Sequence, residues 1–228
     1  MKIGVKLALA QSLLLLALGL AFAMAVSMQL GERLRARSDA VQDRVVEDAL
    51  GMLDAYNQAL KGSVDQYARM FEAELIGQFT LDTQRTMPLG QAQVGILRLD
   101  NTVLNQRVDE VDRFTARTGA VATVFARAGE QLLRVTTSLR RQDGQRALGT
   151  ALDPDSPAYK NLMAGLPYIG KVRLFGRDYM ARYTALENSQ GQVIGATFVG
   201  VDITQDMVNL RARLAKVKVG DSGHVHVL

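Results

Sequence analysis

The sequence contains no cysteine, no tryptophan and only two histidines among its 228 residues. A chain without cysteine forms no disulfide, thiolate metal site or cysteine nucleophile. His224 and His226 lie near the C-terminal end and leave little material for serine–histidine catalysis. The chain has no phosphate-binding glycine loop, HExxH motif or GxSxG motif. We therefore expect no enzyme, cofactor or metal site, with a hydrolase built on paired carboxylates as the enzymatic alternative.

Neither sign of charge is in marked excess. The chain has 27 basic and 23 acidic residues, which gives a net charge of +4. Its basic clusters, Arg33–Arg37 and Arg140–Arg141, are too short to form the basic stripe of a nucleic-acid-binding protein. Hydrophobic residues make up 48% of the chain and aromatic residues only 6%. The hydrophobic and aromatic fractions predict an aliphatic core. The small, dispersed positive charge excludes nucleic acid as an expected partner.

One long hydrophobic run, Leu7–Gly31, contains no charged residue. As a helix it is about 37 Å long at ~1.5 Å per residue, enough to cross about 30 Å of hydrocarbon. We predict an uncleaved transmembrane anchor, with residues 1–6 in the cytoplasm. The alternative is a cleaved signal peptide, since Lys2 and Lys6 precede the run and Ala23-Met24-Ala25 is similar to a cleavage site. Both interpretations place the remainder outside the cytoplasm.

Residues 32–85 are predicted to form one long amphipathic helix, because apolar side chains recur at steps of three and four. Gly51, Gly62 and Gly77 weaken this helix, and Pro88 is expected to stop it. Such a helix packs along a globular domain, or forms a dimeric stalk that carries motion to the membrane, or does both along different stretches. The stripe consists of Val46, Ala49, Leu53, Tyr56, Leu60, Val64, Tyr67, Phe71 and Leu75.

From Val94 onward the pattern changes to short apolar runs separated by turns, which is typical of antiparallel strands. Helices are predicted over Val108–Thr118, after Ser156-Pro157, and over Thr204–Lys216. The fold class is therefore α+β, with a long helix packed on an antiparallel sheet. The predicted strands are Val94–Leu99, Thr102–Leu104, Val121–Ala126, Leu132–Ser138, Lys171–Phe175, Asp178–Leu186 after a Gly176-Arg177 turn, and Val193–Asp202.

Six sequence blocks in order make this region similar to a known family. They resemble the periplasmic Cache fusion domain of methyl-accepting chemotaxis proteins and related bacterial receptors. Each block is short, and their specificity comes from their shared order. The blocks are Val111–Thr115, Thr118–Phe125, Arg134–Ser138, Gly149–Asp153, Leu174–Tyr179 and Gly195–Asp202.

The resemblance implies a PAS-like antiparallel sheet with a small-molecule pocket on one face and the long helix on the other. It also implies an uncleaved anchor and a homodimer in the inner membrane. The segment Val219–Leu228 resembles the opening of a second Cache module. The predicted organisation is a cytoplasmic N-terminus (1–6), a transmembrane anchor (7–31), a long helix or stalk (32–85), a Cache-type sensor domain (86–215) and the start of a second, truncated module (216–228).

Polar side chains on the predicted strands outline the expected pocket. Strict alternation places Arg134 and Thr136 on one face of their strand, and Tyr179 and Tyr183 on one face of another, opposite Arg182. An arginine fork suits a carboxylate, and the basic residues together favour an anionic ligand. The alternative for each residue is a structural role, as an ion-paired arginine or a packed tyrosine. The predicted ligand-binding residues are Arg134, Thr136, Lys171, Arg173, Tyr179, Arg182 and Tyr183.

The function expected from these features is ligand sensing outside the cytoplasm by a chemoreceptor-like transmembrane protein. The ligand would be a small molecule, an anion such as a carboxylate, whose presence is relayed across the membrane. The alternatives are the sensor region of a histidine kinase or diguanylate cyclase, and a membrane-anchored structural stalk without a ligand. A cavity lined by Arg134 and the tyrosines favours sensing, whereas a solidly packed sheet favours the stalk.

Overall fold

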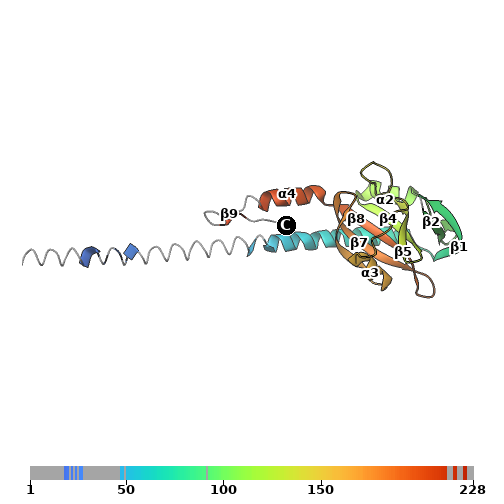
Figure 1. Ribbon diagram of the computed structural model, residues 1–228, viewed down its shortest axis with the longest axis horizontal. Helices are drawn as coiled ribbons and strands as arrows, with labels where there is room; N and C mark the ends of the chain where they lie inside the picture. Colours follow the sequence, from blue (N-terminus) through green and yellow to red (C-terminus); the bar gives the residue numbers. More distant parts are fainter. Residues whose placement is uncertain are drawn as a thin grey trace, which may run out of the picture. The chain divides into compact units, whose positions relative to one another are not determined.

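The computed structural model divides the chain into two compact units. One unit is Ala55–Ala212, and the other combines Met1–Asp54 with Arg213–Leu228. The first unit contains most of a long helix, from Ala55 on, and all the larger strands (Figure 1). The residues that the structure describes are 18–20, 22, 24, 26–27, 47–48, 50–90, 92–214, 218–219 and 223–224.

The predicted membrane anchor, residues 7–31, lies mostly outside the described residues. Those described within it, between positions 18 and 27, are helical. Within the described part of the chain, no helix is both long and apolar enough to cross a membrane. The smaller unit, which combines Met1–Asp54 with Arg213–Leu228, also contains two short paired strands. They are β9 (Lys218–Val219) and β10 (Gly223–His224).

A five-stranded antiparallel sheet forms the centre of the larger unit, with the strand order β5-β4-β8-β7-β6. The central strand β8 is buried from Val193 to Gly200, as its continuous apolar sequence predicts. Five antiparallel strands in this order make the sheet PAS-like, which confirms the predicted α+β class. The strands are β4 (Val121–Ala128), β5 (Gln131–Thr137), β6 (Tyr168–Leu174), β7 (Arg177–Glu187) and β8 (Val193–Asp202).

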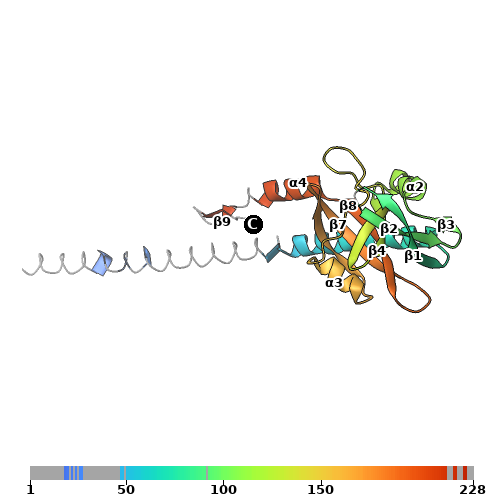
Figure 2. The same ribbon diagram turned by 45° about the vertical axis from the view of Figure 1, so that its right-hand side comes forward.

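A second sheet has three strands in the order β1-β2-β3 and lies at the opposite end of the unit from helix α4 (Thr204–Leu214) (Figure 2). Its strand β1 corrects the prediction of a helix through residue 85. The helix ends at residue 74, and Gly77 has a φ of 149° that disfavours any other residue. Pro88 is tolerated in β1 because β1 is an edge strand. The strands are β1 (Phe79–Leu89), β2 (Ala92–Leu99) and β3 (Thr102–Val103).

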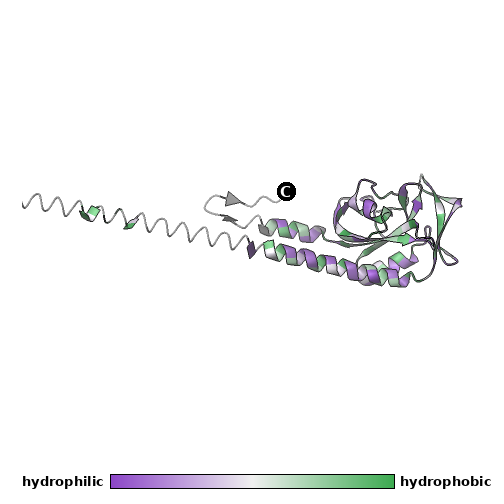
Figure 3. Cartoon of the chain, turned by 90° about the horizontal axis from the view of Figure 1, so that it is seen from below, coloured by the Kyte–Doolittle hydropathy of each residue, from purple (hydrophilic) through white to green (hydrophobic). Residues whose placement is uncertain are grey.

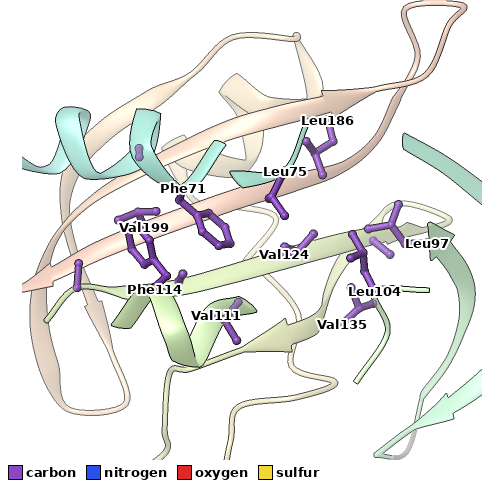
Figure 4. Packing of buried hydrophobic residues seen from close by; sticks show 14 of the residues in the cluster. Phe71, Leu75, Leu97, Leu104, Val111, Phe114, Val124, Val135, Leu186 and Val199 are labelled. Atoms are coloured by element: carbon purple, nitrogen blue, oxygen red, sulfur yellow. The ribbon is translucent and has the colours of Figure 1, made fainter. Parts of the chain in front are cut away.

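The long helix, residues 50–74, buries its apolar stripe against one face of the main sheet. Figure 3 shows hydrophilic and hydrophobic residues interspersed along this helix. Phe71 meets Phe114 of helix α2 (Asp109–Thr118) with ring centroids 5.0 Å apart, next to Val124 and Val199 of the sheet (Figure 4). Within this unit the stripe is therefore a packing surface, as the first interpretation predicted. Its buried members are Val64, Phe71 and Leu75, and Ala68 is buried beside them.

Helix α3 (Pro157–Met163) covers the other face of the main sheet. It starts as predicted, because Ser156 is its N-cap and accepts a hydrogen bond from the Tyr159 amide. Ala158 and Leu162 pack there against a second core that includes aromatic side chains of β4, β7 and β8. The sheet thus has a helix face, packed on the long helix, and an α3 face, packed on α3.

A β-bulge interrupts the pairing of β5 with β4. Thr136 pairs with Val124 and Arg134 with Phe125, so Val135 is the extra residue. On the N-terminal side of the bulge, Arg134 lies on the α3 face with Phe125. Val135, the extra residue, belongs to the core on the helix face. A bulge breaks strict alternation, and this decides which side chains of β5 can share a pocket.

The hairpin between β6 and β7 turns at Phe175-Gly176, because Leu174 pairs with Arg177. The predicted turn at Gly176-Arg177 is therefore wrong by one residue. Both turn residues have positive φ, 50° for Phe175 and 85° for Gly176, as in the type I′ turn that matches the twist of a hairpin.

Candidate functional site

A cavity of about 420 Å³ opens on the α3 face of the sheet. Its volume is in the range of small-ligand pockets. Arg134 of β5 and Tyr183 of β7 form part of its wall, and the segment between β5 and α3 closes one side. The remaining lining residues are Thr150, Ala151, Leu152, Asp153, Ser156, Ala158, Val172, Arg173, Leu174 and Phe175.

The segment beside β5 is held in place by backbone pairing. The Arg134 amide donates to the Thr150 carbonyl at 3.0 Å, and the Gly149 amide donates to the Arg134 carbonyl at 2.9 Å. Gly149 has a φ of 72°, and a Cβ there would lie 2.5 Å from the Leu89 carbonyl oxygen. Only glycine fits this close approach, so residue 149 sets the path of the chain that brings Thr150 to the cavity.

Arg134 is the largest fully buried side chain of the cavity and is only 2% exposed. Its Nη1 donates to the Thr150 hydroxyl at 2.8 Å and, at 3.3 Å, to the Ala151 carbonyl. The guanidinium carbon lies 4.8 Å from the ring centroid of Phe125 and 5.8 Å from that of Phe175, distances that suit cation–π attraction. The two aromatic rings and two oxygens leave part of the guanidinium without a partner.

The charge of Arg134 is not neutralised by the protein. Its Nε is buried and has no hydrogen-bond partner, and no ion pair formed by described residues includes it. Burial lowers the pKa of this guanidinium to about 10, an effect that nearby Tyr183 partly opposes. Arg134 therefore stays cationic at neutral pH, and it holds a donor that an anion in the cavity could use.

Tyr183 faces Arg134 within an aromatic wall. Its ring centroid lies 4.8 Å from that of Phe198, 6.4 Å from that of Phe125 and 6.2 Å from that of Tyr168. Burial raises the pKa of the Tyr183 phenol, so it remains a neutral hydroxyl group that can donate a hydrogen bond. The prediction that Arg134 and Tyr183 face a common space agrees with the structure.

Thr136 lies on the helix face and is not part of the cavity. The bulge at Val135 moves it away from Arg134, and its hydroxyl donates to the Arg107 carbonyl at 2.5 Å. The alternation that predicted a shared face is thus wrong at this point, because it assumed a regular strand.

Arg182 also lies on the helix face, as its alternation with Tyr183 predicted. Its guanidinium forms an ion pair with Asp65 of the long helix and lies 4.0 Å from Glu72. The side chain is 15% exposed. Arg182 therefore joins the sheet to the helix and does not contribute to the cavity.

The three other predicted residues differ in their positions. Arg173 is exposed and lies at the rim of the cavity. Lys171 is exposed and pairs across β6–β7 with Met180, a residue of the helix-face core. Tyr179 is on the α3 face but packs with Leu139 outside the cavity. Of the seven predicted residues, Arg134, Arg173 and Tyr183 line the cavity.

Thr150 and Phe175 are cavity residues that the prediction missed. Thr150 was part of a family-like block but carried no strand pattern that pointed to a partner. Phe175 had a local signal, because Phe-Gly stands where hairpins usually have Asn-Gly.

A larger cavity of about 670 Å³ lies beside the turns that follow β4 and β7. Its arginine, Arg127, donates from Nε to the Gly129 carbonyl and from Nη1 to the Val193 carbonyl. Two of the nitrogens of that arginine, Nε among them, thus already donate to backbone carbonyls. The Arg134 cavity is the better candidate site because it combines enclosure with an unpaired buried charge.

The sequence matches a known protein family. The family model of the Cache 3/Cache 2 fusion domain matches residues 29–228. A solved structure titled "Methyl-accepting Chemotaxis protein X" is similar at 13% sequence identity and a TM-score of 0.43, covering 78% of this chain and 68% of that chain. No curated protein matches the sequence significantly. The chain belongs to the Cache 3/Cache 2 fusion family and contains a Cache-type sensor domain.

Proposed function

We propose that this chain senses a small anionic molecule, such as a carboxylate, outside the cytoplasm and acts as the input part of a chemoreceptor-like membrane protein. The observation that carries the proposal is the buried, uncompensated guanidinium of Arg134. A buried charge without its partner typically costs about 3–5 kcal/mol. A bound anion would supply the missing partner.

The cavity offers two kinds of recognition to such a ligand. Arg134 Nε is an unused donor beside Nη1, whose bonds to Thr150 and Ala151 hold the guanidinium in place. A guanidinium presents its donors in a plane that suits the two oxygens of a carboxylate. The aromatic wall around Tyr183 gives the cavity an apolar surface, which strengthens these interactions.

Strand β7 offers a route from the cavity to the long helix. Consecutive side chains of a strand point to opposite faces, so Tyr183 lines the cavity while Arg182 pairs with Asp65 of the helix. A ligand shifts a receptor only if it binds two conformations unequally. We propose that closure on the ligand moves β7 and, through this ion pair, changes the position of the helix that leads toward the predicted membrane anchor.

The proposal also includes the predicted anchor and a homodimer. The hydrophobic run Leu7–Gly31 supports an inner-membrane location with the sensor domain outside the cytoplasm. In a homodimer, the long helices of the two protomers would run side by side toward the membrane.

Calorimetric titration of the full chain with a panel of small compounds tests the proposal. We expect at least one mono- or dicarboxylate to bind, whereas its amide analogue, of the same size without the charge, binds far more weakly. Binding of only neutral or cationic compounds would contradict the anionic specificity.

A further inference from the structure

Phe175 occupies a backbone position that suits another residue. It is the first of the two turn residues between β6 and β7, with a φ of 50°. This left-handed conformation is disfavoured for a bulky side chain, and type I′ turns prefer asparagine before glycine. Strain of this kind at a cavity is a reason to look for a role of the side chain beyond folding.

The ring of Phe175 is folded back over the cavity and is not left in solvent. Its centroid lies 5.8 Å from the Arg134 guanidinium carbon. The side chain is half-buried and packs against the small cluster of Leu139, Ala147 and Tyr179. On one side, therefore, Phe175 covers the cation that the cavity encloses.

Phe175 also lines a second, outer cleft of about 560 Å³. No other residue lines both this cleft and the Arg134 cavity among the described parts of the chain. The lining of the cleft includes Arg140, Arg141 and Arg177 but no acidic side chain. Arg177 is ion-paired with Asp202, so Arg140 and Arg141 supply the excess positive charge. A basic cleft of this kind raises the local concentration of anions.

We propose that Phe175 is a gate between the basic outer cleft and the Arg134 cavity, and that anionic ligands reach Arg134 from the cleft when its ring swings aside, in addition to the opening of the cavity on the α3 face. The inference rests on the proposed anion-binding function of the cavity. The turn is short and at the surface, so the ring moves without rearrangement of the sheet. After the ligand enters, the ring closes over it and selects compounds small enough to fit beneath it.

The gate can be tested without a known ligand by the uncharged arginine reagent phenylglyoxal. The measurement is the rate of modification at Arg134 relative to exposed Arg113, followed by peptide mass spectrometry of the full chain at neutral pH. The variant F175N replaces the ring with the residue that this turn prefers, and F175Y keeps a ring as the matched control.

For F175N we expect the Arg134/Arg113 rate ratio to rise about tenfold, because the reaction no longer waits for a local opening. For F175Y the ratio should stay within about twofold of the unsubstituted chain. The thermal midpoint of F175N should stay within about 5 °C of that of the unsubstituted chain, because Asn-Gly suits the turn and offsets the lost packing of the half-buried ring.

An unchanged ratio in F175N would overturn the gate. A raised ratio together with a drop of more than about 5 °C in the thermal midpoint would indicate general loosening and would also overturn it. Neither result depends on the charge of a ligand. Failure of the gate is therefore distinguishable from failure of the carboxylate titration, which bears on the proposed function alone.

Discussion

Arg182 and Tyr183 are neighbours on strand β7, yet they serve opposite faces of the main sheet. Tyr183 lines the cavity that encloses Arg134, and Arg182 forms an ion pair with Asp65 of the long helix. One strand therefore joins the candidate ligand site to the helix that leads toward the predicted membrane anchor. The following substitutions separate the binding and relay parts of this arrangement.

Replacement of Arg134 by glutamine should abolish most of the affinity for a carboxylate. A hydrogen bond to a charged group contributes about 1.5–3 kcal/mol, so we expect a loss of roughly 10- to 100-fold. Calorimetry with the tightest-binding carboxylate measures this loss. Arg113→Gln is the matched control, because it removes the same charge from an exposed position on α2. Equal affinities of the Arg134 variant and the control would exclude Arg134 from the site.

The affinity for a carboxylate should depend on pH in a way that reflects burial of Arg134. Burial lowers the pKa of this group to about 10, below its ordinary value of 12.5. A bound anion favours the protonated form, so affinity should be constant near neutral pH and fall about tenfold per unit above pH ~10. The other titratable groups that line the cavity are Asp153, Arg173 and Tyr183. Affinity that holds unchanged to pH ~12 would contradict the lowered pKa.

A pair of threonine variants tests which face of β5 holds the ligand. The Thr150 hydroxyl accepts a hydrogen bond from Arg134, whereas the Thr136 hydroxyl donates to the Arg107 carbonyl on the helix face. Thr150→Val should weaken carboxylate binding about fivefold, because the guanidinium loses a positioning partner. Thr136→Val should lower the free energy of unfolding by about 1 kcal/mol and leave affinity unchanged. The reverse pattern would place the site on the helix face.

The ion pair between Arg182 and Asp65 can be measured by a double-mutant cycle. Arg182→Met, Asp65→Ala and the double variant should give a coupling energy of about 1–2 kcal/mol, because the pair is only partly shielded from solvent. Urea unfolding measures it. Arg69 also pairs with Asp65, but Arg69 is 64% exposed and should contribute little. A coupling energy near zero would remove this pair from the link between sheet and helix.

The same variants test the relay. In the unsubstituted chain, a bound carboxylate should change hydrogen exchange in residues 55–74. In Arg182→Met the carboxylate should still bind, because Arg182 lies outside the cavity, but the change in the helix should shrink. A full change in the helix of this variant would show that the signal takes another route.

The fold was predictable from sequence wherever local chemistry and tertiary packing agree. Strand β8 has its predicted bounds, because a continuous apolar run must be buried on both faces, and α2 ends before Gly119, whose φ is 73°. The helix predicted through residue 85 failed because β1 alternates only weakly and contains Pro88, which an edge strand tolerates. Edge position is a property of the assembled sheet and has no local signature.

The site was partly predictable for the same reason. Arg134 stood out as a charge in the middle of a strand, and Tyr183 as one of two tyrosines on one face with the small Ala181 between them. Thr136 was misplaced because the bulge at Val135 lies in a run of β-branched residues that fits either face. Phe175 required the register of the β6–β7 hairpin, which shifts the expected turn by one residue.

A crystal structure of the chain with its tightest-binding carboxylate tests the central claim most directly. We expect a ligand oxygen within about 2.7–3.2 Å of Arg134 Nε, with Tyr183 and Phe175 against the ligand. A ligand bound in another cavity, with the Arg134 guanidinium still unpaired, would contradict the account.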